Sequence, residues 1–252
     1  PRSEEEDRWV RNQWTGWYES GVSLFYRPNW PHGQYTMPLI FNRQYADMFR
    51  FMAEHGMIGT DFDRLRGQWA AQGTVLYLLA RLHTRPFAPV EELLEEYYSA
   101  FGPAADHVKD YFSYWEEHSM SLDRGGSSPG SAYEGFPLES FDPAADILDE
   151  ALEAAETAPE PEYAQRVRFL QRGLEHSRLC SELSTVYQDD EFYREALEAA
   201  QPGECPRQMV VDRLAEFRDE LKREGVYVSN LNAAARRERS LFRRAGIEGL
   251  AE

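Results

Sequence analysis

The chain has 252 residues, which is enough for one large domain or two ordinary ones with a substantial hydrophobic core. Its hydrophobic content of 42% argues against a disordered chain, and 44 acidic residues against 27 basic ones give a net charge of −17. A chain this acidic repels nucleic acid and anionic lipid unless it keeps a local basic patch. No run approaches the roughly twenty apolar residues that a membrane-spanning helix needs.

The chain opens at Pro1, without an initiator methionine and without a signal-like segment. We therefore expect a processed chain or a piece of a longer one, and its location stays open. Two cysteines, Cys180 and Cys205, allow one disulfide but no disulfide framework.

The first part of the chain alternates between predicted strands and predicted helices. The run TGWYES (15–20) predicts a short strand, and a proline- and aromatic-rich loop separates it from a helix over 42–55. The apolar run MIGTDF (57–62) predicts a second strand, and the next helix includes GTVLYLLARLH (73–83). This alternation is typical of a parallel β/α fold. Because two such units cannot close a sheet, we expect the tail of a larger one.

Helical spacing dominates the rest of the sequence. VEELLEEYYSAFG (90–102) and PAADHVKDYFSYW (103–115) predict two amphipathic helices, the first ending at Gly102. Residues 119–140, rich in Gly, Ser and Pro, predict a linker, and 141–252 a helical bundle region. There, Asp142 is expected to cap a helix with Pro143 in its first position. Two apolar stripes predict bundle core: Tyr163, Val167, Leu170 and Leu174, and Val210, Leu214, Phe217 and Leu221.

Two acidic residues stand where the predicted strands end. In a parallel β/α barrel, active residues lie at the carboxyl ends of the strands, and neighbouring strands are about 5 Å apart. Glu19 and Asp61 are then expected to face one pocket. Glycoside hydrolysis uses such a pair: one carboxyl protonates the leaving oxygen, and the other attacks the anomeric carbon or activates water. Glu19 and Asp61 are therefore the candidate catalytic residues.

Candidate substrate-binding residues surround the same strand ends. Aromatic faces suit sugar rings, polar side chains offer hydrogen bonds, and Arg64 offers a partner for a uronate carboxylate. Alternation along the strand makes Asp61 and Asp63 point the same way. The set comprises Tyr18, Trp30, His32, Asp63, Arg64, Gln68 and Trp69.

Simpler interpretations of these residues stay open. Asp61 or Asp63 would also serve as a helix cap or as a partner of Arg64 or Arg66, and Glu19 as a solvated loop residue. The tryptophans, Trp30 among them, would equally fill a core. Other chemistries are less well supported: GSSPG (126–130) has no strand before it, as a nucleophile elbow needs, and the six histidines lack metal-ligand spacing. No metal and no cofactor are predicted.

Residues 14–118 resemble the C-terminal half of the bacterial domain-of-unknown-function family 4838, which is itself similar to glycoside hydrolases of the α-glucuronidase and hexosaminidase type. The most specific pieces are the Glu-ending run WYES, the PH pair at 31–32, EHGMIG (54–59), YLLARL (77–82) and EEYYSAFGPAA (95–105). The resemblance implies that 1–85 form the last β/α units of a (β/α)8, or TIM-type, barrel. It further implies that 86–118 are helices packed behind that barrel. The earlier strands, where related glycosidases carry acid/base residues, are absent from this chain.

The sequence leads to two functional hypotheses. The first is the C-terminal part of a glycoside-hydrolase-like protein acting on a carbohydrate, with a glycan that contains uronic acid as one candidate and with Glu19 and Asp61 in its site. The second is a non-catalytic helical module that binds a carbohydrate or a protein. Neither the sugar nor the oligomeric state follows from the sequence.

Overall fold

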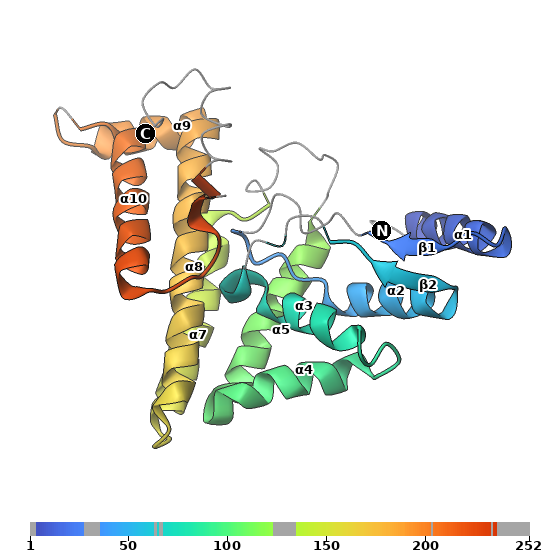
Figure 1. Cartoon of the computed structure of the whole chain (residues 1–252). Coiled ribbons are helices and arrows are strands. Elements are labelled where there is room, and N and C mark those ends of the chain that lie inside the picture. Colours follow the sequence, from blue (N-terminus) through green and yellow to red (C-terminus); the bar gives the residue numbers. More distant parts are fainter. Residues whose placement is uncertain are drawn as a thin grey trace.

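The computed structural model describes residues 4–27, 36–62, 65, 68–122, 135–202, 204–232, 234 and 235, and shows a mostly helical protein (Figure 1). The elements, in chain order, are α1 (Glu4–Glu19), β1 (Leu24–Tyr26), α2 (Asn42–Glu54), β2 (Met57–Thr60), α3 (Trp69–Leu82), α4 (Val90–Tyr98), the 3-10 helix η1 (Ser99–Ala104), α5 (Ala105–Ser121), the 3-10 helix η2 (Leu138–Ser140), α7 (Phe141–Glu156), α8 (Pro161–Gln188), α9 (Asp190–Ala199) and α10 (Pro206–Glu224).

The predicted strand over 15–20 is wrong, because these residues lie in α1 or in the turn that follows it. The helix starts with four acidic residues, which favour a helix N-terminus through the helix dipole. Arg11 reaches back one turn to Asp7, 2.7 Å away, and across to Asp47 of α2, 2.5 Å away. Tertiary contacts of this kind outweigh the β-type local composition of TGWYES.

The sheet consists of β1 and β2, which pair in parallel and are connected through α2. Leu24 is opposite Met57 and Phe25 is opposite Gly59, so the register shifts by one residue at Ile58. The second predicted strand is confirmed, while β1 lies within the segment predicted as a loop. Both strands are short and apolar, which made β1 difficult to distinguish from its surroundings.

The expected (β/α)8 barrel is wrong, as is the α/β class that it implied for the first part of the chain. The described residues hold a single sheet of two short strands, and helices account for most of the remainder. A closed barrel needs a continuous ring of strands. In the structure, the helices that follow β2 pack against one another instead.

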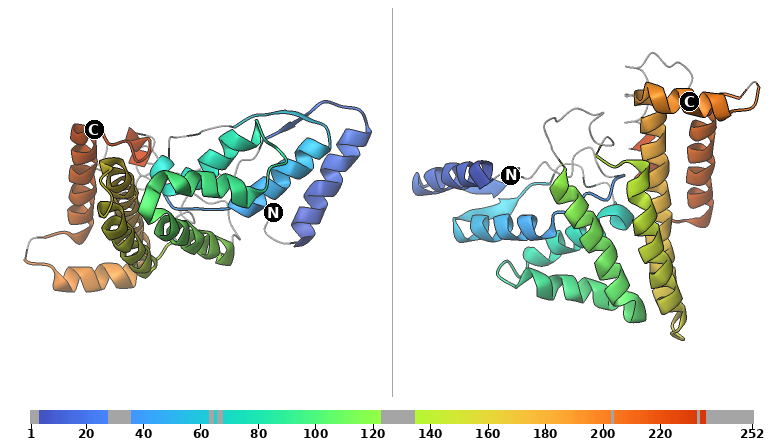
Figure 2. Two further views of the ribbon diagram at one scale, coloured as in Figure 1. Left: turned by 90° about the horizontal axis from the view of Figure 1, so that it is seen from below. Right: turned by 180° about the vertical axis from the view of Figure 1, so that it is seen from behind.

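The hydrophobic core lies mainly among α5, α7 and α8, with α10 packed on the other side of α8 (Figures 1 and 2). Its largest fully buried side chain is Trp115 of α5, which contacts Phe136 and Phe141. One cluster of buried side chains runs from Met37 to Leu214, and so includes residues on both sides of the predicted 119–140 linker. α1 lies at the opposite end of the molecule from α10 (Figure 2).

The predicted helical stripes in α8 and α10 are confirmed. The buried residues on these stripes are Val167, Leu170, Leu174, Val210, Leu214 and Leu221. Tyr163 and Phe217 are partly buried and pack against the core. Close approach of backbones adds to the packing: a Cβ on Gly173 of α8 would collide with Ala70 of α3. The C-terminus of α10 is formed by Gly225, whose φ of 70° places it in the left-handed conformation typical of a helix end.

Two predicted helix boundaries are corrected. α7 begins at Phe141 with Ser140 in the cap position, so Asp142 is not the cap, and Asp142 and Pro143 are the second and third residues of the helix. α4 ends at Tyr98, and the chain continues through η1, where Gly102 adopts a φ of 56° beneath the ring of Tyr163. The GSSPG run lies outside the described residues.

Candidate functional site

The carboxyl ends of β1 and β2 lie together, as expected for parallel strands. The Asp61 N–H donates a hydrogen bond to the Tyr26 carbonyl, 3.1 Å away. The Asp61 carboxylate in turn lies 3.0 Å from the guanidinium of Arg27, and both side chains are about half exposed, at 57% and 50%. The partner that the structure gives Asp61 is therefore a cation that follows β1, in a solvated position.

Glu19 does not join Asp61 at this edge. It is the last residue of α1 and precedes β1, and its side chain is exposed. The ring of its neighbour Tyr18 lies over Gly56 and meets His55 edge-on, with ring centroids 6.1 Å apart. Because Gly56 precedes β2 and Asp61 follows it, the structure places the Tyr18–Glu19 segment at the amino end of the sheet. The two candidate catalytic carboxylates are not brought together.

The other predicted site residues divide into two groups. Gln68 is fully buried and donates to the Gln72 side chain, 3.2 Å away, and Gln72 donates to the Met37 carbonyl. It thus supports the loop before α3. Trp69, the first residue of α3, is half exposed. Trp30, His32, Asp63 and Arg64 lie outside the described residues.

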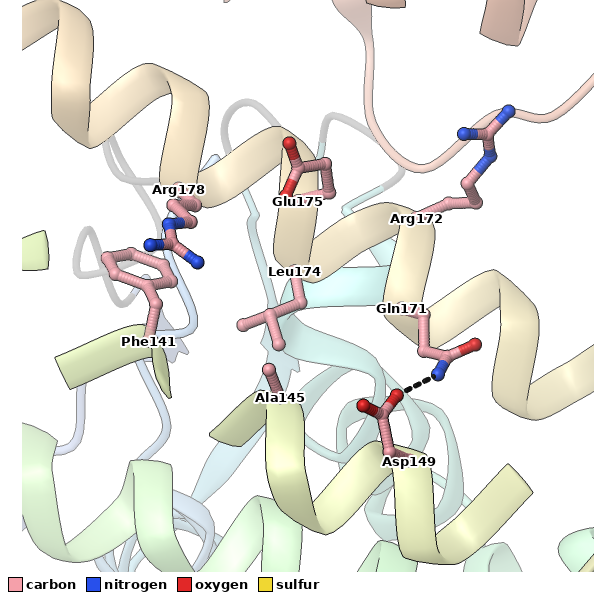
Figure 3. Close-up of a pocket in the computed structure, with 8 residues that line it drawn as sticks. All are labelled: Phe141, Ala145, Asp149, Gln171, Arg172, Leu174, Glu175 and Arg178. Atoms are coloured by element: carbon pink, nitrogen blue, oxygen red, sulfur yellow. Dashed lines mark hydrogen bonds between the residues drawn. The ribbon is translucent and has the colours of Figure 1, made fainter. Parts of the chain in front are cut away.

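A groove of about 280 Å³ runs between α7 and α8 (Figure 3). Its lining residues are Phe141, Ala145, Asp149, Gln171, Arg172, Leu174, Glu175 and Arg178. The apolar side chains form the floor, while the polar ones largely pair with one another or with neighbours: Gln171 donates to Asp149 at 2.8 Å, and Arg178 lies 3.2 Å from Asp142. Its volume is slightly below the usual range for ligand pockets of about 300–1,000 Å³. These features describe a solvated helix–helix junction.

One face of the β1–β2 sheet is bare, a feature that the sequence reading missed. Tyr26 and Met57 pack against the core, whereas Phe25 and Ile58 are 59% and 62% exposed. The Phe25 ring lies across Gly59, where a Cβ would meet it at 2.8 Å. We call Phe25, Ile58 and Gly59 the open sheet face. The sequence signal for this face was the pair of continuous apolar runs LFY and MIG, which place apolar side chains on both faces of the strands. Strands of that type are normally covered on both faces, so one uncovered face leaves apolar side chains exposed.

Exposed aromatic residues continue from the open sheet face along the preceding segment. Trp9, Trp17 and Tyr18 of α1 and Val22 before β1 are all exposed, and none of the residues of α1 is buried. α1 is held instead by a few contacts on one side. The Trp14 indole N–H donates to the His55 carbonyl at 2.8 Å, and the Arg11 guanidinium lies over the Phe51 ring.

A polar cluster is buried between α8 and α10. The Arg218 Nε donates to His176 Nε2 at 3.1 Å, and its Nη2 lies 3.5 Å from the Cys180 sulfur. Burial, and secondarily the Arg218 charge, lowers the pKa of His176 well below its usual value. Cys180 is buried and Cys205 exposed, and both are free thiols, so the disulfide that the sequence allowed is not formed. All three side chains are buried between the two helices, so this cluster belongs to the helix packing.

Comparisons with protein-family models, with curated proteins and with solved structures find no match to this chain. The resemblance to family 4838 therefore stays a prediction from its motifs. Over the part of the chain that the structure describes, no helix combines the length and apolar character needed to cross a membrane.

Proposed function

We propose that this chain is a non-catalytic helical module that binds a partner protein through the open sheet face. The observation that carries the proposal is the exposure of Phe25 and Ile58 on a parallel sheet. Parallel sheets occur almost only with both faces covered. Bare apolar surface of this kind marks interaction sites in soluble proteins.

The composition of the surface favours a protein over a sugar. Ile58 and Val22 present aliphatic side chains, which have neither a flat face for a sugar ring nor a hydrogen-bonding group. The exposed tryptophans of α1 would suit either ligand, because aromatic side chains are enriched at protein interfaces as well. The resemblance to family 4838 would place the module within a carbohydrate-active protein, and its partner would then be another protein that works with that carbohydrate-active protein.

Hydrolysis of a glycosidic bond is less well supported by the geometry. It requires two carboxyl groups roughly 5 to 9.5 Å apart across the scissile bond. Among the described residues, Asp61 is paired with Arg27, and Glu19 lies at the other end of the sheet. Incubating the full chain with a panel of polysaccharides and aryl glycosides tests this point. Release of reducing sugar that Asp61→Asn abolishes would contradict a non-catalytic role.

Site-specific photo-crosslinking tests binding directly. A benzophenone amino acid would replace Ile58 on the open sheet face and, as a matched control, Tyr227 beyond α10, which is also exposed. After irradiation in the native cells, we expect a discrete protein adduct from position 58 and none from position 227. Absence of an adduct at position 58, or the same adducts at both positions, would overturn the proposal.

A further inference from the structure

The proposed function leaves the nature of the partner open, and the sheet itself carries further information. Its strands have three and four residues, and a two-stranded sheet is at best marginally stable by itself. Within the described ranges, the backbone N–H and C=O groups of β1 and β2 form hydrogen bonds with the other strand. One more backbone hydrogen bond joins the Tyr26 carbonyl of β1 to the N–H of Asp61, which follows β2. Each strand therefore presents an outer edge with unused donors and acceptors, which is a template for another strand.

We propose that the partner contributes an extended strand that joins the β1–β2 sheet in parallel, with apolar side chains over the open sheet face and basic residues at its flanks. This inference rests on the proposed function and specifies the partner. Strand addition uses main-chain hydrogen bonds for affinity and alternate side chains for specificity. The parallel direction follows from β1 and β2, because purely parallel sheets are over-represented.

The charges of the segment that carries α1 and β1 indicate the residues expected at the flanks of the added strand. Residues 4–27 carry five acidic groups, four of them in the first turn of α1 and the fifth at Glu19. The same segment has three arginines, of which Arg11 pairs with Asp7 and Asp47 and Arg27 pairs with Asp61, so it keeps a net negative charge. A strand with Lys or Arg beside its apolar core complements this charge.

The same charges argue against a second copy of this chain as the partner. A twofold dimer would bring identical surfaces together, so the acidic helix α1 would approach its own copy. The whole chain carries a net charge of −17, which adds long-range repulsion between copies. A basic partner is attracted both by the acidic residues of α1 and by the net negative charge of the whole chain.

The adduct formed at position 58 identifies the partner segment by peptide sequencing. We expect a β-type apolar run with Lys or Arg at its ends. The reconstituted complex of that partner with the full chain should also slow amide exchange of β1 or β2 by about tenfold or more, since outer-edge N–H groups become bonded. A helical segment, an acidic segment, or a peptide of this same chain in the adduct would overturn strand addition while leaving protein binding in place.

Charge reversal tests the basic flanks separately. Glu19→Lys should weaken the complex about fivefold at low salt, and the loss should shrink as salt is added. The control is Glu216→Lys on α10, which changes the net charge equally at an exposed position far from the sheet. Equal effects of the two variants, or tighter binding by Glu19→Lys, would overturn the charge assignment. No specific adduct at position 58 would instead show that the proposed function itself fails.

Discussion

The guanidinium of Arg27 lies 3.0 Å from the carboxylate of Asp61, and the two residues directly follow the paired strands β1 and β2. The relationship is a consequence of parallel pairing, which aligns the carboxyl ends of the strands at one edge. It gives Asp61 a structural partner in the position where a glycosidase would need a second carboxyl group.

The Arg27–Asp61 pair is expected to contribute little to stability. Both side chains are about half exposed, and solvated ion pairs are typically worth about 0.2–1 kcal/mol. A double-mutant cycle with Arg27→Met and Asp61→Asn should therefore give a coupling energy below about 1 kcal/mol that decreases with added salt. The measurement is denaturant unfolding of the four proteins. A salt-insensitive coupling of several kcal/mol would place the pair in a dry site and reopen a catalytic interpretation of Asp61.

Two glycine-to-alanine changes are expected to have opposite effects on stability, because Gly173 is in close contact with Ala70 and Gly16 has open space around it. Gly173→Ala would place a methyl group against Ala70 where α3 meets α8, and overpacking of this kind costs about 1–3 kcal/mol. Gly16→Ala in α1 has no atom within 4 Å of the new methyl group and should stabilise the helix by about 0.5–1 kcal/mol. Thermal unfolding should lower the Tm of the first variant, while amide exchange should show greater protection of α1 in the second. Stabilisation by Gly173→Ala would mean that α3 and α8 are farther apart.

The helices were predictable from sequence because burial repeats along them with the helical period. Leu170 and Leu174 of α8, for example, are one turn apart and both buried. The same logic failed for residues 15–20, where Trp17 and Tyr18 suggested a strand and the exposed side of a helix was found. Local periodicity does not distinguish a strand from a helix over 15–20. The contacts that hold α1 come from Arg11 and Trp14, and their partners Asp47 and His55 are distant in sequence.

The candidate site was less predictable than the helices for a related reason. Placing Glu19 beside Asp61 required two strand ends at one edge, and the first of those strands lies later, at Leu24–Tyr26. Because β1 begins after Glu19 and does not end there, Glu19 lies at the amino end of the sheet and not at its carboxyl end. Gln68 shows a second reason why the site was difficult to predict. Its polar side chain suggested a ligand contact, whereas in the structure it is buried and forms a hydrogen bond with Gln72.

The buried His176 predicts a loss of stability in mild acid. Burial, and then the charge of Arg218, lowers the pKa of His176 in the folded protein, while the unfolded chain has a pKa near 6.5. Below that unfolded value the unfolded state binds the additional proton. The free energy of unfolding should therefore be at its full value above about pH 6.5 and decrease as the pH falls, by at most about 1.4 kcal/mol per pH unit from this group.

Two variants separate His176 from other titrating groups. The charged or titratable groups in contact with its ring nitrogen Nε2 are the guanidinium of Arg218 on α10 and the thiol of Cys180 on α8. His176→Gln keeps an acceptor for Arg218 but cannot be protonated, so stability between about pH 6.5 and 5 should become nearly constant. His107→Gln, at a partly exposed position beside Glu150, should retain the slope. An unchanged slope in His176→Gln would contradict the assignment.

Trp14 is expected to hold α1 in place, because α1 has no buried residue and few other contacts with the rest of the molecule. Its indole N–H donates to the His55 carbonyl at 2.8 Å, and its ring meets Tyr26 edge-on at 6.5 Å. Trp14→Ala should therefore accelerate amide exchange throughout α1 by about tenfold or more, with little change in α5, α7 and α8. Trp9→Ala, at an exposed position of the same helix, is the control and should leave exchange in α1 nearly unchanged. Equal acceleration by both variants would show that α1 is anchored by Arg11 or by its own helical stability, and that the Trp14 hydrogen bond contributes little.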